Sequence, residues 1–166
     1  ANGSRMKIIS KIEQSEAVVN LDEILRLSDG IMVARGDLGV ELPLQEVPGI
    51  QEEIIRRCIA VGRPVITATQ MLESMVHAPS PTRAEASDVA NAVFDGSSSV
   101  MLSGETAIGV DPTHVVGVMA RIAERADEEF DYPGWSQVLA ALHLDPTDVV
   151  EDSITSREIV ADLVTD

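Results

Sequence analysis

Four short apolar runs alternate with longer amphipathic segments along most of the chain. The runs cover residues 6–12, 30–36, 64–69 and 98–103, and we expect each of them to form a β-strand. Strict alternation of strands and helices predicts an α/β fold with a parallel sheet. From this pattern alone, a doubly wound sheet and part of a (β/α)8 barrel of the TIM type both remain open.

The segments between the runs carry signals for helix ends. Asn20 with Glu23, and Thr82 with Glu85, each predict a capping box at the start of a helix, and Asp111 precedes a proline that opens the last one. Four strand–helix units are half of the eight in a closed barrel, which takes about 250 residues. Such a half barrel has two open parallel edges that must be covered to avoid pairing with other chains.

The alternation ends near residue 130. Residues 131–147 are rich in turn-forming residues, and residues 148–166 again show apolar residues at helical spacing. We therefore divide the chain into a strand–helix domain, 1–130, and a second region, 131–166. The second region reads as a linker and the truncated start of another domain, with a short helical C-terminal extension.

Composition excludes several classes of protein. Hydrophobic residues make up 45% of the 166, which is enough for a real core, and the formal net charge is -16. No basic patch is available to neutralise phosphates, so we expect no nucleic-acid partner. We also expect no membrane span. Cys58 is the single cysteine; we expect it to be buried and inert, and a cytoplasmic location follows as the default.

Charged residues stand at the carboxyl ends of the first two runs. Lys11 and Glu13 are two residues apart, so on a strand they project to the same side, while Ile12 projects to the other. Asp37 directly follows the second run. Charges at the end of an apolar strand are costly unless they meet a ligand, a metal ion or each other. The repetition suggests a mouth that presents polar groups to a small anionic substrate.

Glu13 and Asp37 allow two interpretations. In a parallel sheet they can lie side by side, where two carboxylates repel each other unless a cation lies between them. Hard oxygen ligands without histidine or cysteine favour Mg²⁺ or Mn²⁺. Alternatively, Glu13 forms a structural ion pair with Lys11 or Arg35.

The residues at the ends of the second and third runs can be interpreted either as ligand-binding groups or as ordinary turn and capping residues. Gly36 places a backbone N–H where an anion can approach it closely, but residues 35–39 also read as an ordinary strand-to-loop turn. Thr69 ends the third run before a short helix expected at residues 70–76. A threonine there is usually an N-cap, although its hydroxyl can also face a substrate.

Taken together, the strand ends resemble pyruvate kinase. The resemblance covers about residues 6–130, and the matching motifs occur in the family's order and spacing. They are Lys7–Glu13, Met32–Gly39, Thr67–Met75, Pro81–Val93 and Met101–Ala107. Long matches of this kind are far more specific than a single glycine motif.

The resemblance implies a fold, a reaction and a set of roles. This chain looks like the last four strand–helix units of the family's (β/α)8 barrel. Lys11 matches the catalytic lysine that stabilises charge during phosphoryl transfer between phosphoenolpyruvate and ADP, giving pyruvate and ATP in glycolysis. Glu13 and Asp37 match the carboxylates that bind Mg²⁺ or Mn²⁺. Backbone near Gly36 and Asp37, together with Thr69, matches contacts to the substrate's carboxylate. The family also implies K⁺ and a homo-oligomer, a tetramer.

Two departures from the family pattern bear on activity. Ile108 stands where family members commonly carry a lysine, which affects one phosphate contact on the nucleotide side. The family's K⁺ site and a substrate-binding arginine belong to the half of the barrel that this sequence does not contain. We therefore expect little or no turnover from these 166 residues alone.

Two rival hypotheses belong to other classes. One is a metal-dependent aldolase or lyase of the phosphoenolpyruvate/pyruvate barrel group, which also uses paired acidic ligands. The other is a non-catalytic assembly module, in which two half barrels pair edge to edge.

Overall fold

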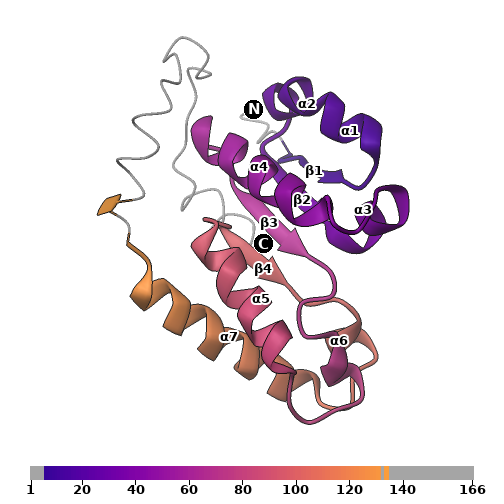
Figure 1. Cartoon of the computed structure of the whole chain (residues 1–166), viewed down its shortest axis with the longest axis vertical. Helices are drawn as coiled ribbons and strands as arrows, with labels where there is room; N and C mark the ends of the chain where they lie inside the picture. Colours follow the sequence, from indigo (N-terminus) through magenta and orange to yellow (C-terminus); the bar gives the residue numbers. More distant parts are fainter. Residues whose placement is uncertain (1–5, 132, 135–166) are drawn as a thin grey trace, which may run out of the picture.

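The computed structural model describes residues 6–131, 133 and 134. Strands and helices alternate along these residues, as Figure 1 shows. In chain order the elements are β1 Ile9–Ile12, α1 Ser15–Val19, α2 Leu21–Leu27, β2 Gly30–Ala34, α3 Arg35–Glu41, α4 Val47–Ala60, β3 Val65–Ala68, the 3-10 helix η1 Glu73–Val76, α5 Arg83–Phe94, β4 Ser99–Met101, α6 Gly104–Ala107 and α7 Pro112–Glu129.

The four strands form one parallel sheet in the order β1-β2-β3-β4. Each strand therefore pairs with the next one along the chain, and Lys11 of β1 lies opposite Met32 of β2. A doubly wound sheet reverses its strand order at a switch point, and no reversal occurs within the described residues. The α/β prediction is confirmed, and the barrel alternative is the one that fits the strand order.

The strands are shorter than their apolar runs. The second strand ends at Ala34 because Arg35 already begins α3, and the fourth covers only Ser99–Met101. The apolar residues outside the strands still serve the core: Leu38 of α3 is fully buried. An apolar run thus marked the position of each strand but overestimated its length.

The described residues form two hydrophobic clusters. The first lies where β1, β2 and β3 meet helices α2 and α4, and Cys58 is fully buried in it, as expected. The second joins η1, α5 and α7 around Met71 and Leu72. Helices α5 and α7 lie against each other (Figure 1).

Of the two predicted capping boxes, one is confirmed. Thr82 Oγ1 accepts the N–H of Glu85, and the Glu85 carboxylate accepts the N–H of Thr82. The box predicted at Asn20 is wrong. The Asn20 side chain instead donates to the carbonyl of Glu16 at 2.8 Å, because α1 ends at this residue and its carbonyls also need donors.

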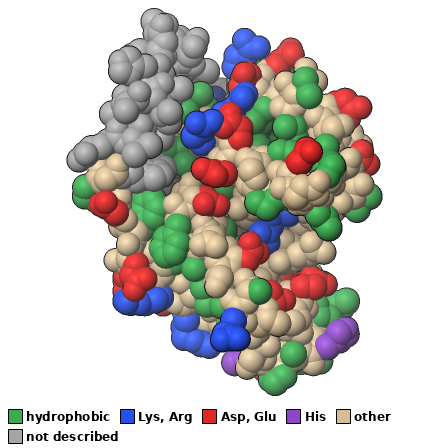
Figure 2. Space-filling model, viewed as in Figure 1, with side chains coloured by type: hydrophobic (Ala, Val, Ile, Leu, Met, Phe, Trp, Pro, Cys, Tyr) green, Lys and Arg blue, Asp and Glu red, His purple; other side chains and the backbone are tan. Residues whose placement is uncertain are grey.

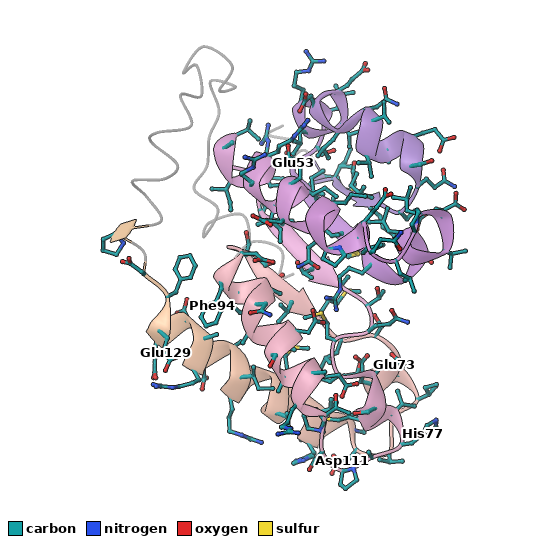
Figure 3. All side chains as sticks on the ribbon, in the orientation of Figure 1. Glu53, Glu73, His77, Phe94, Asp111 and Glu129 are labelled. Atoms are coloured by element: carbon teal, nitrogen blue, oxygen red, sulfur yellow. The ribbon has the colours of Figure 1, made fainter. Side chains whose placement is uncertain are left out.

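Helix α7 begins at Pro112, as predicted, and its N-cap is Asp111, whose carboxylate accepts the N–H of His114. Figure 3 shows the two ends of this helix, marked by Asp111 and Glu129. No helix among the described residues is long and apolar enough to cross a membrane. Almost all of the predicted second region, 131–166, lies outside the described residues.

Acidic side chains are spread over the visible face in Figure 2, with lysines and arginines among them rather than in one patch. This distribution agrees with the excess of 28 acidic over 12 basic residues. The face seen in Figure 2 shows no continuous positive patch among the described residues that could bind a polyanion.

Candidate functional site

Lys11 connects the ends of the first two strands. Its Nζ lies 2.8 Å from Oδ2 of Asp37 and also forms an ion pair with Oε2 of Glu13. Lys11 belongs to β1, Glu13 follows that strand directly, and Asp37 is the third residue of α3, which follows β2. The parallel pairing of β1 with β2 brings these side chains together, as the sequence predicted.

Lys11 and Asp37 have shifted pKa values at this site. Hydrogen bonds and charge interactions with Asp37 and Glu13 raise the pKa of Lys11 to about 12. The hydrogen bond from Lys11, with its positive charge, lowers the pKa of the Asp37 carboxyl. Lys11 therefore stays fully protonated, and Asp37 ionised, across the neutral pH range.

Two carboxylates from neighbouring strand ends make a donor set that fits a hard divalent cation. Glu13 and Asp37 have half-exposed side chains and already share one cationic partner, Lys11. Mg²⁺ keeps several waters and needs only one or two protein carboxylates, so this pair suffices for it. No group of three or more histidine, cysteine or acidic residues around a common point occurs within the described part of the chain. Further ligands would have to come from water or substrate.

Thr69 joins the end of β3 to the end of β2. Its Oγ1 accepts the backbone N–H of Gly36 at 2.7 Å and donates to the carbonyl of Ala68 at 2.6 Å. A Cβ on residue 36 would lie 3.3 Å from this Oγ1, so glycine allows the close approach. Gly36 and Thr69, predicted separately, are therefore direct neighbours, and Gly36 adjoins Asp37 in the sequence.

Two local expectations at this site are wrong. Thr69 is not the N-cap of a helix over residues 70–76: η1 begins at Glu73 after Leu72, and both Thr69 and Gln70 have left-handed backbone, with φ of 71° and 54°. Residues 35–39 form the first part of α3 rather than a turn. Two glycines disfavour a helix, but the buried side chain of Leu38 ties this one to the core.

The ion-pair alternative for Glu13 is correct for Lys11 and wrong for Arg35. Arg35 turns away from Glu13 and pairs with Asp88 of α5, with Nη1 and Oδ1 2.7 Å apart. Sequence reasoning missed Asp88 because it lies 53 residues later, inside an amphipathic helix where an acidic residue carries no special signal.

The segment after β4 contains another residue that the sequence did not reveal. Glu105 is fully buried, and its carboxylate accepts the N–H groups of Leu72 at 3.0 Å and Ser103 at 2.8 Å. It therefore ties the segment after β3 to the end of β4. A fully buried glutamate is rare.

Comparison with known proteins identifies the same family that the sequence motifs resemble. The family model described as "Pyruvate kinase, barrel domain" matches residues 1–116. A pyruvate kinase of Clostridium acetobutylicum is 60% identical over 130 residues, which are 78% of this chain and 28% of the relative. One of Bacillus licheniformis is 51% identical over 166 residues, or 98% and 28%.

A relative from another organism gives a similar match. A pyruvate kinase of Dictyostelium discoideum is 50% identical over 170 residues, which cover 98% of this chain and 34% of the relative. The chain thus spans about a third or less of the length of these curated relatives. Since the family model covers well over half of the chain and agrees with the strand order, the chain belongs to the pyruvate kinase family.

Proposed function

We propose that this chain is part of a pyruvate kinase and contributes phosphoryl-transfer groups to the reaction of phosphoenolpyruvate with ADP, which gives pyruvate and ATP. The observation that carries the proposal is the position of Lys11 between Glu13 and Asp37 at the ends of two adjacent parallel strands. Ligands of parallel α/β sheets bind outside the carboxyl ends of the strands.

Lys11 acts in this proposal as a fixed positive charge. With its pKa at about 12, it holds its proton at neutral pH and stabilises negative charge on the phosphoryl group rather than acting as a base. Phosphoryl transfer depends mainly on positioning and charge neutralisation, which a protonated lysine supplies.

Glu13 and Asp37 are the residues that would hold Mg²⁺ or Mn²⁺. A bound divalent cation supplies positive potential next to carboxylates that otherwise repel an anionic substrate. Because both side chains are about half exposed, they remain accessible to such an ion.

Gly36 and Thr69 would bind the carboxylate of the substrate, beside Asp37. In the structure the Gly36 N–H donates to the Thr69 hydroxyl, which in turn donates to the carbonyl of Ala68. A substrate carboxylate offers stronger acceptors to both donors, since hydrogen bonds to charged acceptors are roughly twice as strong as neutral ones. The two donors would therefore exchange their present bonds, to Thr69 and to Ala68, for two bonds to the ligand.

The remaining parts of the activity are proposals about the longer protein. K⁺, a cytoplasmic location and a homo-oligomer follow from family membership, and the rest of the barrel must supply the groups that these residues lack. Ile108, 77% exposed after α6, offers no charge where the family commonly has lysine. We expect the 166-residue chain alone to show little or no turnover.

A graft tests the proposal directly. Residues 1–166 replace the matching span of the Bacillus licheniformis enzyme, to which they are 51% identical, and turnover is measured by a coupled assay with Mg²⁺ and K⁺. We expect the graft to be active and K11M to lose at least about 100-fold in kcat. The matched control is K7M, because Lys7 pairs with Asp29 instead of the two strand-end carboxylates.

Metal binding is read out in the same graft. E13Q and D37N should each raise the Mg²⁺ concentration needed for half-maximal activity, whereas D29N should not. A folded graft without turnover, or a K11M variant as active as K7M, would contradict the proposal. Robust turnover by the isolated chain would contradict the need for the rest of the barrel.

A further inference from the structure

The turn that follows β3 has an unusual backbone. Thr69 and Gln70 are consecutive non-glycine residues with positive φ, 71° and 54°. The left-handed region is sterically unfavourable for a residue with a Cβ, so two such residues in succession persist only where surrounding contacts impose the conformation. We call these two residues the Thr69–Gln70 turn.

The Arg35 side chain supplies those contacts. Its Nη2 donates to the carbonyls of Thr69, at 2.9 Å, and Gln70, at 3.2 Å, and its Nε also points at the Thr69 carbonyl, at 3.3 Å. The guanidinium thus binds the backbone of both left-handed residues. Its side chain is only 11% exposed, which strengthens these bonds relative to a solvated arginine.

The contacts between the two strand ends are reciprocal. The side chain of Arg35 binds the backbone of Thr69, while the side chain of Thr69 binds the backbone of Gly36, the next residue after Arg35. A shift of the turn therefore moves the Thr69 hydroxyl and removes the partner of the Gly36 N–H at the same time.

Helices on the outside of the sheet anchor the arginine. Nη1 donates to Asp88 of α5 at 2.7 Å and points at Oε1 of Gln51 in α4 at 3.5 Å. Gln51 in turn donates to Asp95 at 3.0 Å, just after α5. Nη2 also lies 2.8 Å from the sulfur of Met71. All three nitrogens of the guanidinium are thus engaged within the protein, which leaves little capacity for direct contact with a substrate.

We propose that Arg35, anchored by Asp88, is a positioning residue that holds the Thr69–Gln70 turn and thereby places the Thr69 hydroxyl and the Gly36 N–H for the substrate carboxylate. The consequence for catalysis rests on the proposed function above; the consequence for the turn does not. Arg35 acts through these two groups and is not itself a catalytic residue.

Hydrogen exchange of the Gly36 amide in the 166-residue chain tests the positioning claim without activity. R35Q should lower the protection of this amide by at least about tenfold, because the Thr69 acceptor moves away. R35K should lower it too, since an ammonium ion does not reproduce the planar fork. The control is R57Q: Arg57 pairs with Glu53 and Asp22 away from the strand ends. The Val33 amide in β2 reports whether each variant is folded.

Two further variants keep the test decisive. If R35Q unfolds, the milder variants R35K and D88N test the proposal instead. Each should lower the hydrogen-exchange protection of the Gly36 amide while the Val33 amide stays protected. Protection of Gly36 equal to that of the unsubstituted chain in R35K and D88N, or in a folded R35Q, would overturn the proposal.

Kinetics of the graft provide the second readout. R35Q should raise KM for phosphoenolpyruvate about tenfold or more while changing KM for ADP less than about twofold. Loss of folded enzyme alone would lower kcat and leave both KM values unchanged, and that result would overturn the catalytic part. A graft that is inactive before any substitution counts against the proposed function, and the exchange experiment still decides the role of Arg35 in the turn.

Discussion

The hydroxyl of Thr69 accepts the backbone N–H of Gly36 at 2.7 Å, although the two residues are 33 positions apart in the sequence. This bond joins the ends of β2 and β3 at a place where the chain has no regular ladder left. The bond depends on the left-handed backbone of Thr69 and Gln70. Substitution at this turn therefore measures the energetic cost of its conformation.

Q70G should stabilise the fold. Gln70 is exposed and has φ of 54°, and glycine adopts this conformation without the steric cost of a Cβ. We expect a gain of about 0.5–1 kcal/mol in the free energy of unfolding after the added flexibility of glycine is counted. Urea denaturation measures it. Q70A is the matched control, because it removes the same side chain and keeps the Cβ. Equal stabilities of Q70G and Q70A would contradict the strain at this position.

The proximity of Lys11, Glu13 and Asp37 could be predicted from the sequence, because the topology of the sheet alone brings these residues together. Once strands alternate with helices, the sheet is parallel and the carboxyl ends of consecutive strands meet at one edge. The capping box of Thr82 and Glu85 was predictable for a related reason: all of its interactions lie within four residues.

The Arg35 contacts were not predictable in this way. They join residues 16 to 53 positions apart, and each member has an ordinary local role as a strand-end or helix residue. Left-handed backbone at Thr69 and Gln70 gave no signal either, since glycine and asparagine are its usual markers. Tertiary contacts impose that conformation against local preference, and Asn20 failed as a cap because the preceding helix competes for its side chain.

E105Q should destabilise the protein. The buried Glu105 carboxylate accepts two backbone N–H groups, and glutamine keeps one oxygen while it turns an NH₂ group toward the other donor. We expect a loss of about 1–3 kcal/mol, the cost of leaving a buried donor unsatisfied. The urea midpoint measures it, with E124Q on the exposed face of α7 as control. A loss no larger than that of E124Q would show that Glu105 does not hold the two segments together.

Glu85 should make stability depend on acid. Burial alone would raise the pKa of its carboxyl, but hydrogen bonds from Ser74 and Thr82 outweigh burial and hold it below the ordinary value of 4.5. The unfolded chain then binds its proton more tightly, so the contribution is complete above pH 4.5 and is lost as the pH falls through the lower, folded value.

The corresponding measurement compares urea midpoints at neutral pH with those in the acid range. E85Q should lower the midpoint at neutral pH and should show a weaker decline toward acid than the unsubstituted chain. The control is E124Q, which should keep the original decline. Parallel pH profiles for E85Q and the unsubstituted chain would rule out this carboxyl as a source of acid sensitivity.

Cys58 should be almost unreactive in the folded protein. It is fully buried among the helix α4 and β-strand side chains of the first cluster, and burial raises the pKa of its thiol to about 12. At pH 8 a thiol with this pKa is ionised to about one part in 10⁴, and only the thiolate reacts with disulfide reagents. We expect labelling by such a reagent to be at least about 10³-fold slower than after unfolding in guanidinium chloride. As an internal control, E124C adds one exposed thiol, so a single equivalent should react at once and the second only on unfolding. Rapid release of two equivalents from the folded variant would mean that the cluster around Cys58 opens far more readily than its packing implies.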